Sequence, residues 1–292
     1  MKIVASRDGT LIACEQGGRG PHLVLVHGAS ANRLRWEAVR PRLEEHFTVV
    51  RMDRRGRGDS GDSPEYAIER EFEDVATVVN SLDAPVLLLG HSFGAVCALE
   101  AAMRTDKLGG LVLYEAPLRE GESLTSPDLP ERLERLLAIG DRECVIRTFL
   151  AEVPRLSPNE IEMLASSPAW PGRIAAAHTL PRELRSLDTY RLPEQVGKLS
   201  IPVLLLLGGD SPPHFGRANA ALQKFLPGSR CVVMPGQKHI AMDTAPDLLV
   251  GAVLGFWQDV VLSAIMSAIP PLSGVQQTST RRSAAAARWP TC

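Results

Sequence analysis

The segment LLLGHSFGAV at residues 87–96 decides the fold of this chain. An apolar run ends at Gly90, Ser92 follows two residues later, and Gly94 opens a second apolar stretch. Gly-x-Ser-x-Gly between a strand and a helix is typical of a nucleophile elbow, in which glycines let the two elements approach closely. The same spacing also occurs in ordinary strand-to-helix turns, where serine is common. A catalytic interpretation of Ser92 therefore needs a base, an acid and an oxyanion hole elsewhere in the chain.

The composition is that of a globular protein with one large core: 292 residues, 45% hydrophobic and 23% charged. The formal net charge of −2 gives no general attraction to nucleic acid or to an anionic membrane. The five cysteines lack paired spacing, which argues against a disulfide framework or a zinc site and favours a reducing compartment. Because residues 1–10 also lack signal-peptide features, we expect a cytoplasmic protein.

Short apolar runs alternate with amphipathic segments through most of the chain, which predicts an α/β fold with a mostly parallel sheet flanked by helices. The predicted strands are an N-terminal hairpin around Asp8-Gly9 and residues 22–28, 47–53, 85–92, 108–116, 201–210 and 229–236. The predicted helices are residues 32–45, 67–82, 93–104, 214–225 and 245–264.

The alternation stops between residues 118 and 197, where short amphipathic helices are separated by prolines. We therefore assign residues 1–117 and 198–264 to the core, 118–197 to a helical cap and 265–292 to a disordered tail. The four cap helices are expected at 130–140, 142–153, 158–167 and 171–180. Such an insertion either covers a pocket at the carboxyl ends of the strands or forms a separate packing module.

The apolar stretch at residues 248–269 is long enough to span a bilayer. Gln258 and Asp259 fall in its middle, however, and an aspartate at the centre of a membrane helix costs about 3 kcal/mol on insertion scales. We therefore expect this stretch to be a helix that packs on the core, and we expect no membrane partner.

A serine hydroxyl needs a base within hydrogen-bond reach, and histidine is the usual one. Of the seven histidines, His239 follows the last predicted strand and precedes a helix start. The loop after a parallel strand is where a catalytic base is expected, so we assign that role to His239. The alternative is a surface histidine in a loop.

A carboxylate must orient the imidazole and stabilise its charge. Asp210 ends a predicted strand and lies between Ser92 and His239 in the chain, so we assign it this role. Glu115, at the end of the preceding strand, is the rival acid, but Ala-Pro and the insertion follow it at once. Asp243 is too close to His239 in sequence to be a strong candidate.

The tetrahedral intermediate needs two preorganised N–H donors. One is expected from Phe93, at the N-terminus of a helix whose dipole favours an anion. The other is expected from Ala29, in the HGAS turn after the first core strand. The remaining residues expected to bind substrate are His27, Gly28, Trp36 and Trp170. Tryptophans, however, more often simply pack in a core.

Together these motifs resemble those of the α/β-hydrolase superfamily, in its esterase- and lactonase-like branch with a helical cap. The matching stretches are HGAS (27–30), MDRRGRGDS (52–60), GHSFG (90–94), LLLGGDSP (205–212) and HIAMDTAPDLL (239–249). The resemblance covers roughly residues 1–260 and implies an eight-stranded sheet. It favours a structural ion pair for Arg55 over a phosphate-binding patch. Lys238 departs from the glycine usual there, which either changes the shape of the loop or places a cation near the pocket rim.

The resemblance implies a serine hydrolase that cleaves esters or lactones through Ser92, His239, Asp210 and an acyl-enzyme, without metal or organic cofactor. The expected partner is a small-molecule ester or lactone, with macrolide-type lactones among the candidates. The protein is expected to be a monomer or homodimer. Two alternatives stay open: hydrolysis of a carbon–carbon bond or perhydrolysis with the same triad, and a ligand receptor without activity.

Overall fold

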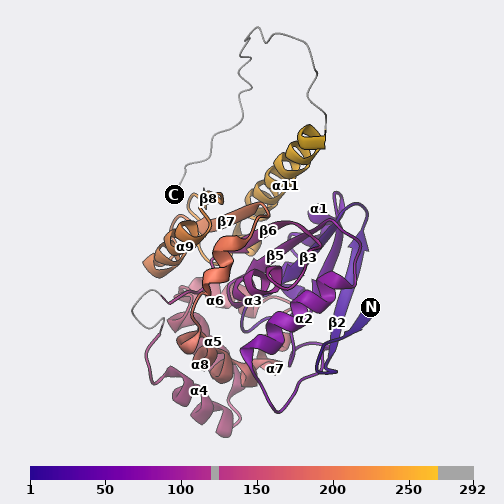
Figure 1. Ribbon diagram of the computed structural model, residues 1–292. Helices are drawn as coiled ribbons and strands as arrows, with labels where there is room; N and C mark the ends of the chain where they lie inside the picture. Colours follow the sequence, from indigo (N-terminus) through magenta and orange to yellow (C-terminus); the bar gives the residue numbers. More distant parts are fainter. Residues whose placement is uncertain (120–124, 269–292) are drawn as a thin grey trace, which may run out of the picture.

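The computed structural model of the protein describes residues 1–119 and 125–268. They form one eight-stranded sheet with helices on both faces. A group of further helices lies beyond the carboxyl ends of the central strands (Figure 1). The strands are β1 (Lys2–Ala5), β2 (Leu11–Gly18), β3 (His22–Val26), β4 (Thr48–Met52), β5 (Val86–His91), β6 (Leu108–Tyr114), β7 (Val203–Gly208) and β8 (Arg230–Met234). Their order is β1-β2-β4-β3-β5-β6-β7-β8. The first two pairings, β1–β2 and β2–β4, are antiparallel and the others parallel, which confirms the predicted fold class.

The helices of the core flank this sheet. They are η1 (Arg33–Trp36), α1 (Arg40–Glu44), α2 (Ile68–Asn80), α3 (Phe93–Ala102), α9 (Pro213–Phe225), α10 (Ala241–Thr244) and α11 (Pro246–Ala268). Central strands are buried on both faces because successive side chains point in opposite directions. In β3, Leu23 and Leu25 join the hydrophobic cluster that contains α11, whereas Val24 and Val26 join the cluster that contains α2 and α3.

The register of the central strands aligns their carboxyl ends. His91 at the end of β5 lies opposite Tyr114 at the end of β6, so Ser92 and Glu115 leave the sheet side by side. The Ser92 N–H donates to the Tyr114 carbonyl at 2.8 Å. The sheet therefore brings the two residues that follow these strands to one edge.

The predicted helical insertion lies between β6 and β7 and is confirmed. Its elements are α4 (Leu129–Ala138), α5 (Arg142–Glu152), α6 (Pro158–Ala165), α7 (Trp170–Ala175), η2 (Ala177–Thr179), α8 (Leu180–Thr189) and η3 (Glu194–Lys198). The sequence analysis predicts one helix at 171–180 where the chain forms α7 and η2, and it misses α8. Prolines at the first turns of α7 and α8 begin new helices here, because proline fits a helix start and not a helix interior.

Buried ion pairs join this cap to the core. Glu183 of α8 accepts from Arg54 and from Arg57, both in the loop after β4. Glu71 of α2 accepts from Nε and Nη2 of Arg54 at 2.8 and 2.7 Å. The Arg57 guanidinium also donates to the Thr179 hydroxyl at 2.8 Å. Because these side chains are buried, the cap is held where its charges and those of the core compensate one another.

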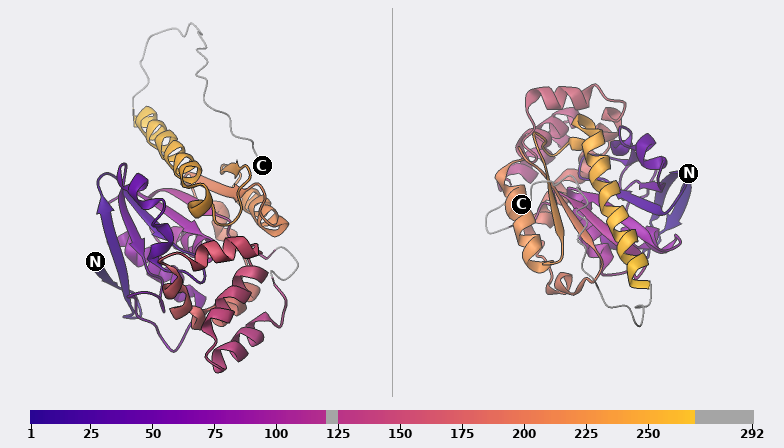
Figure 2. Two further views of the ribbon diagram at one scale, coloured as in Figure 1. Left: turned by 180° about the vertical axis from the view of Figure 1, so that it is seen from behind. Right: turned by 90° about the horizontal axis from the view of Figure 1, so that it is seen from above.

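The helix α11 only partly fulfils the expectation for the C-terminal stretch. Residues Pro246–Met266 are long and apolar enough to cross a membrane, but 33% of the most apolar window is buried. The buried side chains are Leu249, Val250, Ala252, Val253, Phe256 and Trp257. The last turns extend away from the sheet (Figure 2), and their exposed apolar side chains are Val261, Leu262, Ile265 and Met266.

The predicted core packing is therefore confirmed for the first half of α11 only. The helix continues to Ala268, so the prediction of a disordered tail from residue 265 starts too early. The rest of that predicted tail, residues 269–292, lies outside the described residues.

Arg55 makes the structural ion pair that its motif implies. Its Nε and Nη2 donate to the two carboxylate oxygens of Asp74 at 2.7 and 2.8 Å, and Nη1 donates to Asp8 at 2.9 Å. The Arg55 and Asp74 side chains are 0% and 1% exposed. The arginine thus ties the loop after β4 to α2 and to the N-terminal hairpin.

We expect Arg55→Ala to lower the free energy of unfolding by about 3–5 kcal/mol, because it leaves the Asp74 carboxylate buried without its bidentate partner. Urea-induced unfolding followed by circular dichroism measures the change. The control is Arg70→Ala, which removes an exposed partner of Glu73 on the same helix and should change stability little. A loss no larger than that of the control would contradict the prediction.

Candidate active site

Ser92 lies in a sharply reversed turn between β5 and α3. Its φ of 55° and ψ of −127° fall outside the regions that non-glycine residues normally adopt. The turn needs glycines on either side, since a Cβ on Gly90 would collide with the Gly94 carbonyl and a Cβ on Gly94 would collide with the His27 carbonyl. Ser92 lines a pocket, and the described residues offer its hydroxyl no hydrogen-bond partner. This is the geometry of a nucleophile elbow.

His239 is fixed from three sides. Its Nδ1 lies 2.6 Å from Oε2 of Glu115. The ring stacks on Phe215, with centroids 4.5 Å apart and planes 14° apart. His91, the neighbour of Ser92, donates from Nε2 to the His239 carbonyl at 2.9 Å. Because a carboxylate accepts, Nδ1 carries the proton, and Nε2 is left as an acceptor on a residue that lines the same pocket as Ser92.

Glu115 directly follows β6 and has a φ of 49°. Its side chain is fully buried, and each carboxylate oxygen has a donor. Oε1 accepts from the Gly208 N–H at 2.7 Å and from the Ser211 hydroxyl at 2.5 Å, while Oε2 faces His239. These donors compensate the burial of the carboxylate and fix its direction.

The expectation that Asp210 orients His239 is wrong. Asp210 is exposed in the turn after β7, and its N–H donates to the Gln237 carbonyl at 2.9 Å. The carboxylate beside His239 belongs to Glu115, the rival acid of the sequence analysis. Both acids end strands at the same edge of the sheet, so sequence order alone does not distinguish them. In the structure, the turn that contains Asp210 supplies donors to the Glu115 carboxylate instead.

The two expected oxyanion donors, Ala29 and Phe93, both line the pocket. Neither N–H donates to an acceptor within residues 1–119 and 125–268. The turn before Ala29 packs directly on the elbow, because a Cβ on Gly28 would lie 2.8 Å from the Ser92 Cβ. The two N–H groups therefore remain available beside the Ser92 side chain, as an oxyanion hole requires.

His27 has a structural role in this turn. Its Nε2 accepts from the Arg54 N–H at 3.1 Å, so Nδ1 carries the proton and donates to the Gly28 carbonyl at 2.8 Å. Burial lowers the pKa of His27 well below its usual value, which keeps the ring neutral. His27 thus shapes the turn that presents Ala29.

Of the residues expected to bind substrate, none lines the pocket that contains Ser92; these are His27, Gly28, Trp36 and Trp170. Trp36 is fully buried with its ring 6.3 Å from that of His91, and Trp170 packs in the core beneath Arg147. The cap contributes many of the apolar side chains that line the pocket, among them Phe149, Leu150, Val153, Leu156, Leu164, Leu184 and Leu187. The two tryptophans therefore pack away from the pocket, which leucines and phenylalanines line.

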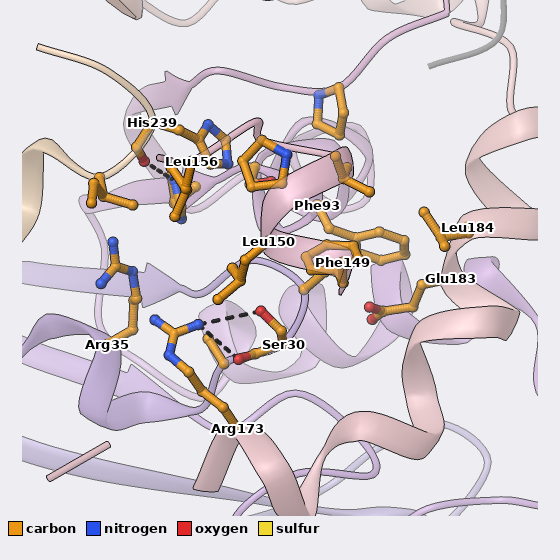
Figure 3. Close-up of a pocket in the computed structure, with 18 of the residues that line it drawn as sticks. Ser30, Arg35, Phe93, Phe149, Leu150, Leu156, Arg173, Glu183, Leu184 and His239 are labelled. Carbon is orange, nitrogen blue, oxygen red and sulfur yellow. Dashed lines mark hydrogen bonds between the residues drawn. The ribbon is translucent and has the colours of Figure 1, made fainter. Parts of the chain in front are cut away.

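Three charged side chains also line the pocket: Arg35, Arg173 and Glu183 (Figure 3). None of the three is predicted from the sequence. Arg173 and Glu183 lie on α7 and α8, which carry no motif that relates them to the core, and Arg35 lies in η1, outside the matching motifs. Lys238, which is expected near the rim, donates to Glu160 of the cap at 3.3 Å. Within the described part of the chain, no group of three or more His, Cys, Asp or Glu side chains is placed to hold a metal ion.

Two further histidines of the pocket stay neutral. Burial and the neighbouring His239 lower the pKa of His91 well below its usual value. Burial, followed by the charge of Arg155, lowers the pKa of His214 to about 4. Both rings are therefore uncharged at neutral pH.

Comparison with known proteins agrees with this geometry. Residues 23–252 match the Alpha/beta hydrolase family. The 2-(acetamidomethylene)succinate hydrolase of Mesorhizobium japonicum is 26% identical over 250 residues, covering 82% of this chain and 88% of that protein. The crystal structure of an alpha/beta hydrolase from Sphaerobacter thermophilus is 36% identical with a TM-score of 0.76, covering 88% of this chain and 100% of that chain. The esterase RhEst1 from a Rhodococcus species is 25% identical with a TM-score of 0.66, covering 89% and 98% of the two chains. The chain therefore belongs to the Alpha/beta hydrolase family.

Proposed function

We propose that the protein is a serine hydrolase that cleaves carboxylic esters or lactones through an acyl-enzyme. The observation that carries the proposal is the buried Glu115–His239 hydrogen bond beside Ser92 at one end of the sheet. A base that is oriented by a carboxylate and a serine hydroxyl that lines the same pocket are the components that acyl transfer uses. The similarity to an esterase and to another hydrolase supports the same class of reaction.

In this mechanism Ser92 Oγ attacks the substrate carbonyl while His239 Nε2 takes its proton. The Glu115 carboxylate stabilises the imidazolium that forms, and the N–H groups of Ala29 and Phe93 donate to the oxyanion. The imidazolium then protonates the leaving alkoxide, and the acyl group remains on Ser92. Water, deprotonated by His239, attacks the acyl-enzyme and releases the acid, which restores the serine hydroxyl.

The cap contributes to the same reaction by its apolar lining. Leucine side chains and Phe149 cover the end of the sheet, so the acyl part of a substrate binds among apolar groups. Exclusion of water there strengthens the electrostatic interactions of the triad and of the oxyanion donors. An ester or lactone with an apolar segment next to its carbonyl matches this lining.

Ser92→Ala should lower kcat for p-nitrophenyl butyrate by about 10⁶-fold, because the acyl group then has no serine oxygen to which it can be transferred. The matched control is Ser166→Ala, which removes an exposed serine hydroxyl of the cap and should leave kcat unchanged. A fluorophosphonate probe should label the wild type at Ser92, as seen by peptide mass spectrometry. Equal turnover by the wild type and Ser92→Ala would reject the proposal, as would binding of esters without turnover.

The choice between the two carboxylates is tested by Glu115→Gln and Asp210→Asn. Glu115→Gln keeps the shape but removes the charge that stabilises the imidazolium, so kcat should fall by about 10³- to 10⁴-fold. Asp210→Asn should have little effect, because that side chain is exposed and does not bond His239. Steady-state kinetics with p-nitrophenyl butyrate measure both variants. The reverse order of effects would restore Asp210 as the acid.

A further inference from the structure

The pocket contains a buried arginine that has no carboxylate partner. Arg173 of α7 is 4% exposed, and its Nη1 donates to the carbonyl and to the hydroxyl of Ser30 at 2.8 and 3.2 Å. Its Nε is buried without a partner, and no described residue bonds its Nη2. The edge of the guanidinium formed by Nε and Nη2 therefore has no partner among the described residues. An edge of this kind binds a carboxylate through two parallel hydrogen bonds.

The other buried arginines around the pocket are compensated. Arg35 lines the same pocket and is paired with Asp243, while Arg54 and Arg57 share Glu183. For Arg173, burial and then the charge of Arg35 lower the pKa to about 9, so the group remains a cation at neutral pH. A buried cation without an anion is costly, and an anionic ligand would remove that cost.

The position of Arg173 relates this cation to the reaction centre. Its hydrogen bonds reach Ser30, the residue after the oxyanion donor Ala29. In Figure 3 the guanidinium groups of Arg35 and Arg173 lie toward one side of the pocket and Glu183 toward the other, with Ser30 between Arg173 and Glu183. The positive end of the pocket thus adjoins the turn that would hold the acyl carbonyl, and the negative charge of Glu183 is already compensated by two arginines.

We propose that Arg173 binds a carboxylate in the acyl part of the substrate, so that the preferred substrates are esters or lactones of dicarboxylic acids with one free carboxylate. This inference rests on the proposed function and names its substrate class. Apolar side chains of the cap would contact the carbon chain between the two carbonyl groups, and Arg173 would fix its far end. Arg173 is a specificity-determining residue in this assignment, because it contacts the substrate away from the reacting atoms.

The experiment compares two esters with the same leaving group, mono-p-nitrophenyl glutarate and p-nitrophenyl pentanoate. The wild type should have the higher kcat/KM for the glutarate ester, which differs by its free carboxylate. Arg173→Gln should lower the ratio of the two kcat/KM values by about 10- to 100-fold, the effect of losing a charge-assisted pair in a buried site. Arg173→Lys, which keeps the positive charge, should retain part of the preference.

The ratio of the two kcat/KM values distinguishes a role of Arg173 in binding the carboxylate from a role in stabilising the fold. Arg173 also holds Ser30, so a purely structural defect would lower kcat/KM for both esters alike and leave the ratio unchanged. The matched control is Arg142→Gln, because Arg142 donates to the carbonyls of Ile174 and Ala175 at the end of α7 but does not line the pocket. This control should leave the ratio unchanged.

A binding measurement does not depend on turnover. Glutarate should bind Ser92→Ala in calorimetry, and the Ser92→Ala/Arg173→Gln double variant should lose that binding. An unchanged ratio in Arg173→Gln, or equal glutarate affinity in the two variants, would overturn the inference while leaving the serine hydrolase intact. Failure of the proposed function would differ, because the wild type would then hydrolyse neither ester faster than Ser92→Ala.

Discussion

The reversed backbone at Ser92 is the constraint on which the rest of the site depends. A residue with positive φ directly after a central strand is strained, and its surroundings must hold it in place. The Ser92 N–H bonds the neighbouring strand at Tyr114, and Gly90 and Gly94 allow the strand, the helix and the turn at His27 to meet. Without that close approach, the hydroxyl would not leave the sheet beside the oxyanion turn.

A positive φ also occurs at the residue that follows the neighbouring strand β6. Glu115 also follows its strand with positive φ, which carries its side chain across the sheet edge toward the turn after β7. There Gly208 and Ser211 bond one carboxylate oxygen and leave the other for His239. The turn after β7 therefore donates hydrogen bonds to the Glu115 carboxylate. The carboxylate beside His239 comes from the end of β6, which lies next to the strand that precedes Ser92.

This arrangement explains which parts of the site can be predicted from sequence. Strands buried on both faces appear as apolar runs, and the elbow glycines and the loop of His239 have fixed positions relative to those runs. The acid is different, because Glu115 and Asp210 both end strands at one edge. Which of them reaches the imidazole depends on the backbone at residue 115 and on the exposure of residue 210, and neither is visible in the spacing of residues.

The pocket lining was the least predictable part for a related physical reason. Cap helices are placed by tertiary contacts, and no periodic pattern relates a residue such as Arg173 to the elbow. Trp36 and Trp170 follow the usual behaviour of tryptophan, because their large area makes them effective packing residues, and both are buried without lining the pocket.

Charge compensation between cap and core links these observations. Glu183 and Glu160 of the cap each bond cations of the core, so the two parts meet through paired charges. Arg173 is a cation of the cap that bonds the core. Its acceptors there are the carbonyl and the hydroxyl of Ser30, and neither carries a negative charge. Arg35, Arg54 and Arg57 have carboxylate partners, whereas Arg173 has none among the described residues. Arg173 therefore places a positive charge beside the turn of Ala29 and Ser30, where we propose that the acyl group binds. The contacts between the cap and the core thus also set the charge of the pocket. Of the two arginines that line it in the described part of the chain, Arg35 has a carboxylate partner and Arg173 does not, and by our proposal Arg173 selects the substrate.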